Sequence, residues 1–415
     1  MATLGIDFGT SNSAVATLVN GKIKRIQVEP DNDTLPTSVF FDFDDQIVQF
    51  GSVANQNLLN GSDGRYMRAL KSVLGTGLMA ERRMIIGKKF DFYDIISEFL
   101  SALKSRAEQS EGVVFDHAIS GRPVYFHSDD AARNAKAEQD LRECYRRAGF
   151  KSVEFMFEPE AAALAAHASS RGDGGLGLIV DIGGGTSDYC LFETGKNSKI
   201  NIVASHGVRL GGTNFDKVLN LEYFMPLLGR GAQIKKMMSE GVVTAPNSIF
   251  HDLATWEKIP FCYTPELKNT VRDLQRQAFE PELFKRLGRL IADRAGHELA
   301  FMAERAKITA NQTEHGAAKI DLDLIDDGLY VGINQADLAR IMSDLCQVID
   351  RSVQDTLDNA GCKPEQVSEV IYVGGSSQMH MVQAVLRGIF PHAKFRLSGV
   401  FTAVVDGLAL AIDNS

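Results

Sequence analysis

One short pattern occurs twice in the chain and limits its fold more than any other feature. It is an apolar strand that ends at an aspartate, then a glycine–threonine turn, then a second strand. The first copy is 5–13 (Gly-Ile-Asp-Phe-Gly-Thr-Ser-Asn-Ser) and the second is 180–188 (Val-Asp-Ile-Gly-Gly-Gly-Thr-Ser-Asp). The dipeptide Asn20-Gly21 predicts a further hairpin turn after the first copy. A device repeated in this way indicates two halves that are built alike.

The rest of the chain alternates strands with helices, which predicts an α/β fold. The Gly- and Asp-rich segment 171–175 is the best linker, so we expect one half over 1–174 and the other over 175–415. N-cap aspartates, first-turn prolines and terminal glycines mark the helices. These helices are expected over 131–147, 160–168, 281–306 and 336–360.

Composition excludes several classes of protein. Of 415 residues, 44% are apolar and 23% are charged, which is ordinary for a globular protein and excludes a disordered chain. The net charge of −9 repels phosphodiester backbones, so we expect no nucleic-acid partner. The sequence lacks a stretch of about 18 apolar residues and a signal-peptide pattern, so we expect no membrane partner. Five scattered cysteines favour reduced thiols and a cytoplasmic location.

Asp7 and Asp181 each stand where a strand ends and a glycine turn begins. Because glycine has no Cβ, backbone N–H groups in both turns can approach phosphate oxygens, and the threonines add hydroxyl donors. Two facing carboxylates need a cation between them, and hydrated Mg²⁺ on a nucleotide fits, because Mg²⁺ keeps its waters. The alternative for either copy is an ordinary hairpin. The turn residues concerned are Gly9, Thr10, Gly183, Gly184, Gly185 and Thr186.

Three other places have both a functional and a purely structural interpretation. Glu158 can orient an attacking water, or it can be a first-turn acid that the helix dipole favours. Glu304 and Lys307 can hold a ribose, or they can form an exposed salt bridge on one helix face. The Gly-Gly-Ser turn at 374–376 can lie against a nucleoside, or it can simply join a strand to a helix. From these residues alone, the structural interpretation is favoured at Glu158 and at the Glu304–Lys307 pair.

Taken together, the motifs resemble the nucleotide-binding half of the DnaK-type heat-shock chaperones, within the actin and sugar-kinase superfamily. Besides the two aspartate–glycine segments, the matching stretches are Phe157–Leu164, Leu210–Asp216, Ala303–Lys307 and Val373–Ser376. They follow the family's order and extend over nearly the whole chain. A short bacterial branch of the family also has stretches like Gly121–Pro123, Lys71–Gly75 and Met225–Gly229.

The resemblance implies an actin-like fold of two ribonuclease-H-like lobes, with inserted subdomains at about 34–91 and about 217–333. It implies ATP or ADP as the nucleotide, with Mg²⁺ held through water by Asp7 and Asp181. Glu158 would position the attacking water, and Asp188 and Thr186 would assist the reaction. The remaining nucleotide contacts would come from Gly9, Thr10, Ser11, Gly183, Gly184, Gly185, Gly211, Gly212, Glu304, Lys307, Gly374, Gly375 and Ser376.

Three departures from the family pattern affect the expected activity. The family's catalytic lysine lies in a Gly-x-x-x-Lys-like segment, which begins here at Gly51 and places neutral Asn55 at that position; Lys71 belongs to a different position. Hydrolysis is therefore expected to be slow or absent. The two arginines that sandwich adenine match Ile308 and Gln378, so weak base recognition is expected. The motifs of the nucleotide-binding half extend over nearly the whole chain, so we expect the chain to lack the peptide-binding domain.

The function expected from the sequence is a chaperone-like nucleotide switch, and a slow ATP phosphohydrolase if it is active. Another protein would bind around residues 232–265 and respond to the closure of the lobes. Two alternatives stay open. One is a small-molecule kinase of the same superfamily, which would need a basic, polar acceptor pocket and a catalytic acid in the first half; neither has a clear candidate in the sequence. The other is a non-catalytic actin-like scaffold.

Overall fold

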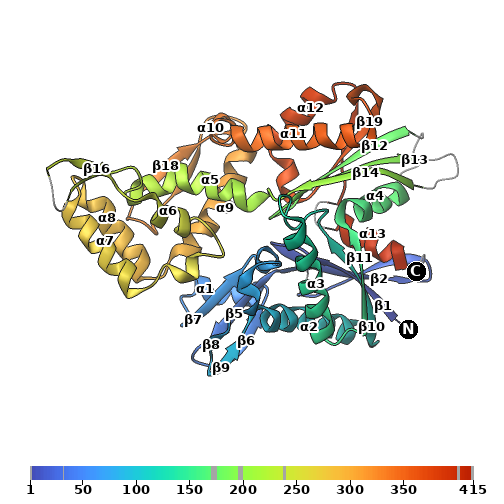
Figure 1. Ribbon diagram of the computed structural model, residues 1–415, viewed down its shortest axis with the longest axis horizontal. Coiled ribbons are helices and arrows are strands. Elements are labelled where there is room, and N and C mark those ends of the chain that lie inside the picture. Colours follow the sequence, from blue (N-terminus) through green and yellow to red (C-terminus); the bar gives the residue numbers. More distant parts are fainter. Residues whose placement is uncertain are drawn as a thin grey trace. The chain divides into compact units, whose positions relative to one another are not determined.

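The structure is a computed structural model that describes residues 2–30, 32–169, 175–194, 200–236, 240–399 and 402–412. It has a mixed α/β fold, as the sequence predicts (Figure 1). The chain forms two compact units, one of residues 1–212 with 347–415 and the other of residues 213–346. These units divide the chain differently from the two lobes expected from the sequence, and the lobe boundaries stay a prediction. Residues 171–174 of the expected linker lie outside the described residues.

The first unit contains a sheet in the order β11-β10-β1-β2-β3. Asn20 and Gly21 join β2 to β3 with φ angles of 52° and 71°, the left-handed pair that a two-residue hairpin turn requires. The predicted hairpin is therefore confirmed. The strands are β1 (Ala2–Phe8), β2 (Asn12–Val19), β3 (Lys22–Ile26), β10 (Phe115–Arg122) and β11 (Ser152–Phe157), with β4 (Thr34–Pro36) beside β2.

A second sheet of the same unit runs in the order β14-β13-β12-β19-β20. Its strands β12 and β13 form an antiparallel hairpin with Asp181 opposite Asp188, as β1 and β2 do with Asp7 opposite Ala14. Each hairpin also has a parallel neighbour, β19 beside β12 and β10 beside β1. Both copies of the sequence pattern thus fold alike. The strands are β12 (Gly175–Ile182), β13 (Ser187–Thr194), β14 (Ile200–Val208), β19 (Val367–Val373) and β20 (Lys394–Leu397).

Further elements complete the first unit. The helices are α1 (Ser52–Leu59), α2 (Phe92–Glu111), α3 (Ala131–Arg147), α4 (Glu158–Ser169), α12 (His380–Ile389) and α13 (Ala403–Ala411), with 3₁₀ turns η1 (Leu70–Val73), η2 (Gly77–Ala80), η6 (Pro364–Gln366) and η7 (Gly375–Gln378). The short strands are β5 (Ser38–Asp42), β6 (Val48–Phe50), β7 (Gly64–Arg68), β8 (Arg83–Ile85) and β9 (Lys88–Phe90). Helix α3 has the predicted bounds, and its N-cap Asp130 accepts a hydrogen bond from the Arg133 N–H at 2.9 Å.

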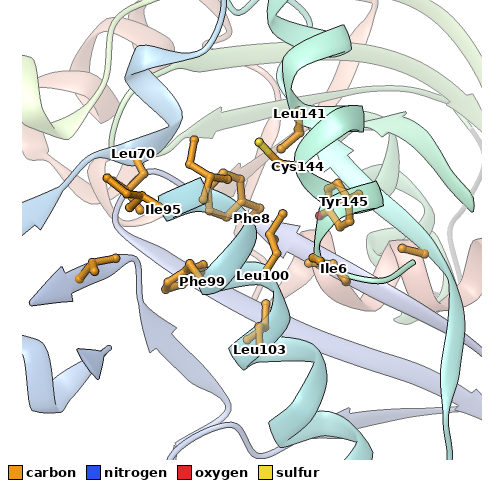
Figure 2. Packing of buried hydrophobic residues seen from close by; sticks show 14 of the residues in the cluster. Ile6, Phe8, Leu70, Ile95, Phe99, Leu100, Leu103, Leu141, Cys144 and Tyr145 are labelled. Atoms are coloured by element: carbon orange, nitrogen blue, oxygen red, sulfur yellow. The ribbon is translucent and has the colours of Figure 1, made fainter. Parts of the chain in front are cut away.

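Helices α2 and α3 share a buried apolar core with the first sheet. Figure 2 shows Phe8 of β1, Phe99 of α2 and Tyr145 of α3 in this core, together with Leu70 of η1. Burying a large apolar side chain stabilises the fold by roughly 1.5–3 kcal/mol. The core therefore fixes both the end of β1, which carries Asp7, and the segment next to Leu70.

Helices α4 and α13 pack closely enough to require small residues. A Cβ at Gly407 of α13 would overlap the Ala161 carbonyl of α4. The alanine-rich sequence that predicts α4 is thus used for close helix packing. The helix begins at Glu158, two residues before the predicted start.

The second unit corrects one predicted helix. The helix expected over 281–306 is two helices, α8 (Pro281–Ala292) and α9 (Gly296–Gln312). Arg294 has a φ of 55°, which no helix continues through. The Tyr263 hydroxyl accepts a hydrogen bond from the Gly296 N–H at 3.1 Å and donates one to the Arg294 carbonyl at 3.0 Å. It thus satisfies backbone groups that a continuous helix would have paired internally.

The helix expected over 336–360 is likewise two helices, α10 (Gln335–Ile341) and α11 (Ser343–Ala360), of which α11 continues into the first unit. Trp256 is buried and lies edge-on to Phe301. The other elements are α5 (Gly212–Leu219), α6 (Asn247–Leu253), α7 (Pro265–Gln277), β15 (Gln233–Lys235), β16 (Val242–Thr244), β17 (Ala318–Asp321), β18 (Tyr330–Ile333), a π turn η3 (Asn220–Phe224) and 3₁₀ turns η4 (Met225–Leu228) and η5 (Ile259–Phe261).

The five cysteines all lie among the described residues, and each is a free thiol. Within the same residues, no helix combines the length and the apolar character that crossing a membrane requires.

Candidate functional site: two glycine turns above a cluster of acids

The turns of the two equivalent hairpins lie against each other. A Cβ at Gly184 would overlap the Ser11 hydroxyl, and a Cβ at Gly185 would lie 2.7 Å from the Thr10 hydroxyl. The second turn is closed by a hydrogen bond from the Gly183 N–H to the Thr186 carbonyl at 3.0 Å. The structure therefore brings together the residues that the sequence predicts for phosphate binding, and glycine is needed for the close approach.

A third turn packs on the second hairpin. A Cβ at Gly211 would lie 2.6 Å from backbone atoms of both Gly184 and Gly185. The Gly212 N–H donates to the Gly183 carbonyl at 2.9 Å. The Leu-Gly-Gly segment predicted to contact nucleotide therefore supports the glycine turn directly.

The fourth predicted turn lies at the base of the same hairpin. Gly374 has a φ of 76°, and a Cβ there would lie 2.8 Å from the Asp181 carboxylate. The residue that follows, Gly375, begins η7, and Ser376 within it is buried. The Ser377 hydroxyl donates to the Gly374 carbonyl at 2.7 Å and holds the turn closed.

Four acids of the first unit act on one another electrostatically. Burial raises the pKa of Asp7 and of Asp188 to about 7, and the negative charge of Glu158 adds to both shifts. The pKa of Asp181 lies well above its usual range for the same two reasons, with further contributions from Asp188 and Asp7. Ionised carboxylates that raise one another's pKa in a desolvated site favour a bound cation.

Lys71 is the lysine that lies at these acids. This corrects the sequence-based assignment, which placed neutral Asn55 at the position of the family's lysine. Lys71 lies in η1 and is buried, and its ammonium group forms an ion pair with the Glu158 carboxylate. Its positive charge also lowers the pKa of Asp7, Asp181 and Asp188, against the larger effect of burial. Glu158 is thus more than a first-turn helix acid, because it contributes to the electrostatics of the whole cluster.

Asn55, the residue predicted to replace the lysine, lies elsewhere. It belongs to α1, and its side-chain oxygen accepts a hydrogen bond from the Tyr66 hydroxyl at 2.8 Å. The Gly-x-x-x-Lys spacing predicted the wrong position, because the lysine at the acids follows β7 and lies in the 3₁₀ turn η1. A usable signal was the single charge in the apolar run Ala69–Leu74 (Ala-Leu-Lys-Ser-Val-Leu), since lysine is rarely buried unless it is paired.

Asp188 is held by the loop that follows β10. Its Oδ1 accepts a hydrogen bond from the Val124 N–H at 2.7 Å. The buried guanidinium of Arg122 donates to the carbonyls of Pro123 and Val124, both at 3.0 Å, and pairs with Glu138. The Gly-Arg-Pro segment thus shapes a loop whose backbone fixes one of the four acids.

The acids suit a hydrated cation better than a directly ligated one. Among the described residues, no three His, Cys, Asp or Glu side chains lie close enough together to ligate one metal ion. Mg²⁺ keeps several waters and uses only one or two carboxylates. Asp7 and Asp181, at the ends of β1 and β12, are compatible with that mode, and burial together with neighbouring carboxylates raises the pKa of both.

In the second unit, Lys307 of α9 forms an ion pair with Asp216 of α5, with 2.7 Å between Nζ and Oδ1. Both residues are buried. Lys307 is therefore not at the exposed position that the structural interpretation of this pair expected. A role for Glu304 and Lys307 in holding a nucleoside stays a prediction.

Comparison with known proteins agrees with the resemblance seen in the sequence. The Hsp70 protein family model matches residues 3–244 and 284–408. The chaperone protein DnaK of Thermosipho melanesiensis is 27% identical over 415 residues, which cover 98% of this chain and 58% of that protein, and DnaK of Thermosipho africanus gives the same values. The chain thus spans less than two thirds of the length of these relatives. Because the family match covers most of the sequence and includes both glycine turns, the four acids and Lys71, the chain belongs to the Hsp70 family.

Proposed function

We propose that this chain is a Mg-ATP-dependent, chaperone-like nucleotide switch that hydrolyses ATP. Its fold is of the actin-like ATPase type, with ribonuclease-H-like lobes over 1–174 and 175–415 and insertions at about 34–91 and about 217–333. The free cysteines favour a cytoplasmic location. Membership of the Hsp70 family supports each of these assignments, and the two equivalent hairpins support the paired lobes.

In this proposal the phosphates of ATP or ADP lie against the two glycine turns and the third turn packed on them. The backbone N–H groups and hydroxyl groups of the turns donate to phosphate oxygens, as glycine-rich turns do in other nucleotide sites. The residues that do this are Gly9, Thr10, Ser11, Gly183, Gly184, Gly185, Thr186, Gly211 and Gly212.

The acids and Lys71 have separate roles. Asp7 and Asp181 would hold Mg²⁺ through its waters, and the bound ion would neutralise charge on the phosphates. Lys71 stabilises negative charge that develops on the transferred phosphoryl group. Glu158 orients the attacking water, and Asp188, fixed by the Val124 N–H, assists it. The slow hydrolysis expected from Asn55 no longer follows, because the lysine is present.

The contact between the two glycine turns, with the acids at their base, carries this proposal. Isothermal titration with ATP and ADP, with and without Mg²⁺, tests it. Asp181→Asn keeps the shape of the side chain and removes one charge, so it should weaken Mg²⁺-dependent binding by about tenfold, which corresponds to about 1.4 kcal/mol. Asp350→Asn, at an exposed position on α11, is the matched control. Equal affinity with Mg²⁺ and with EDTA would show that the proposal is wrong.

The nucleoside would be held by Glu304, Lys307 and the turn of Gly374, Gly375 and Ser376. Arginine stacked on a base contributes on the order of 1 kcal/mol or more. Ile308, which is 45% exposed, and Gln378 have no guanidinium to supply such stacking. We therefore expect ATP and GTP to bind with similar affinity, and strong selectivity for ATP in a competition titration would contradict this part of the proposal.

A further inference from the structure

The segment that carries Lys71 is held in an unusual backbone conformation. Ala69, just before η1, has a φ of 59°, and Gly75, just after it, has a φ of 75°. Both angles lie in the left-handed region, which costs energy for a residue with a Cβ such as alanine. A conformation of this kind persists only where surrounding contacts impose it. The contacts around residues 69–76 therefore determine the position of the backbone that carries the Lys71 side chain.

Two side chains hold the carbonyl groups of this segment. His127, buried in the loop after β10, lies 2.8 Å from the Leu74 carbonyl through its Nε2. Arg209, just after β14, donates through Nη2 to the Ser72 carbonyl at 2.8 Å. The Nη1 of Arg209 lies 3.1 Å from the Nδ1 of His127. The two side chains thus bind carbonyl groups within and just after η1, and they contact each other.

These contacts fix the state of the imidazole. A carbonyl can only accept, so Nε2 carries the proton that bonds the Leu74 carbonyl. A guanidinium can only donate, so Nδ1 must carry a lone pair and accept from Arg209. This assignment follows from the hydrogen-bond partners. The pair therefore requires a neutral His127, and a protonated ring would break its bond to Arg209.

Arg209 also belongs to the phosphate turns by sequence. It precedes Leu210, whose carbonyl accepts a hydrogen bond from the Ser187 hydroxyl at 2.7 Å. The next residue, Gly211, packs on the glycine turn of the second hairpin. One side chain thus spans the distance between the turn system at 183–212 and the segment at 69–76.

We propose that the Arg209–His127 pair is a positioning device that sets the Lys71 ammonium relative to the phosphate-binding turns. This inference rests on the proposed function, since it gives Lys71 its role in hydrolysis. Neither residue touches the reacting atoms in this proposal. Each acts through the backbone of Ser72 or Leu74.

The surroundings of His127 give the device a pH dependence. Burial lowers the pKa of His127, the positive charges of Arg209 and Arg133 lower it further, and the Leu74 carbonyl and Asp130 oppose the shift. The imidazole is therefore neutral at pH 7 and above. As the pH falls well below 6.5, the ring gains a proton and the contact with Arg209 is lost.

Two measurements on the full chain test the proposal. Hydrogen exchange without nucleotide should show faster exchange across 69–76 in Arg209→Met than in the wild type, because the Ser72 carbonyl loses its donor. The single-turnover rate of ATP hydrolysis should fall about tenfold in Arg209→Met at pH 8, with MgADP affinity unchanged. Arg351→Met, at an exposed position on α11, is the matched control for both measurements.

The ratio of wild-type to Arg209→Met rates should fall from about ten at pH 8 toward one at a pH below the lowered pKa of His127, because the protonated ring of the wild type no longer accepts from Arg209. Because both proteins contain the same acids, other titrations cancel in this ratio. In His127→Asn, whose side-chain oxygen still accepts from Arg209 near the Nδ1 position, the ratio to Arg209→Met should no longer change with pH. A loss that merely reflected instability would not follow the charge of His127.

The outcomes separate this proposal from the function on which it rests. Unchanged exchange across 69–76 in Arg209→Met, or a rate ratio that does not depend on pH, would overturn the positioning device. If Lys71→Met hydrolyses ATP at the wild-type rate while Arg209→Met still loosens the segment, the proposed role of Lys71 is wrong and the contact is only structural.

Discussion

At the scale of single residues, Lys71 carries the sharpest prediction. Its ammonium lies at Glu158 and acts on three further acids. Removing one group that stabilises transition-state charge typically costs about 3 kcal/mol, or roughly a hundredfold in rate. We expect Lys71→Met to lower the single-turnover rate of ATP hydrolysis by that factor, while Lys394→Met, at an exposed position on β20, leaves it unchanged.

The same assay tests the residue that sequence spacing placed in the lysine's position. The Asn55 side chain accepts a hydrogen bond from the Tyr66 hydroxyl, away from the acids. Asn55→Lys should therefore bring no gain in rate. A rise in turnover on this substitution, together with normal turnover in Lys71→Met, would show that the assignment of Lys71 is mistaken.

The raised pKa of Asp7 predicts how stability depends on pH. Its pKa is about 7 in the folded chain and near 3.8 when unfolded, so the folded state binds more protons between these values. The contribution of Asp7 to the free energy of unfolding is therefore fully present below about pH 4 and is lost as the pH rises through 7. Asp7→Asn cannot titrate, so it should lose less stability than the wild type between pH 5 and pH 8.

Urea denaturation of the nucleotide-free chain at the two pH values measures this effect. The difference between wild type and Asp7→Asn should be at least about 1 kcal/mol, the free energy of one pKa unit. Adding Mg²⁺ and ADP should recover part of the loss in the wild type. Equal pH dependence in both proteins would mean that Asp7 carries no unfavourable charge.

At the scale of elements, the glycine turns are joined by close backbone packing that leaves no space for a side chain. A Cβ at Gly211 would meet backbone atoms of Gly184 and Gly185 at 2.6 Å, and backbone cannot move aside as a flexible side chain can. We expect Gly211→Ala to destabilise the chain by about 1–3 kcal/mol, the usual range for overpacking. We also expect weaker ADP binding, because the turn that it distorts faces the phosphates in our proposal.

A glycine in open space provides the control. Gly388 lies in α12, and a Cβ at this position would meet nothing within 4 Å, so alanine there should be neutral or slightly stabilising. Thermal unfolding and ADP titration compare the two variants. If both glycines tolerate alanine equally, packing between the turns contributes nothing to the site.

How far the sequence predicts these elements depends on whether their signals are local. The hairpins and helix α3 could be predicted, because Asn20-Gly21 and the Asp130 cap act within a few residues. The break between α8 and α9 could not, because the Tyr263 hydroxyl that satisfies its backbone comes from 31 residues away from Arg294. Both predicted aspartates fall at one acid cluster, whereas Lys71 was missed because its burial depends on an acid 87 residues distant in sequence.

At the scale of the whole molecule, the family match is interrupted between residues 244 and 284. The gap contains α6 and α7 of the second unit. It overlaps the region around 232–265, where the sequence analysis expects another protein to dock. Docking of a partner protein on this segment stays part of the proposed switch.

Such a switch requires the lobes to respond to the γ-phosphate. In our proposal the γ-phosphate contacts turns from both predicted lobes, so ATP favours a closed form and ADP does not. A ligand can shift that equilibrium only by its difference in affinity for the two forms, which is typically about 1–3 kcal/mol in coupled systems. Small-angle scattering of the chain with MgATP and with MgADP should therefore give different radii of gyration.

The variant Asp181→Asn should abolish this difference at Mg-ATP concentrations that saturate it, because the charge that ties the metal to the second hairpin is gone. Asp350→Asn should keep the difference, which separates loss of the switch from a general effect of removing a carboxylate. Scattering must be recorded in the first seconds after mixing, or with Lys71→Met, so that hydrolysis does not convert the ATP state into the ADP state. Identical curves for the two nucleotides in that slowly hydrolysing variant would mean that binding leaves the lobes unmoved, and the chain would then be a nucleotide-binding protein without a switch.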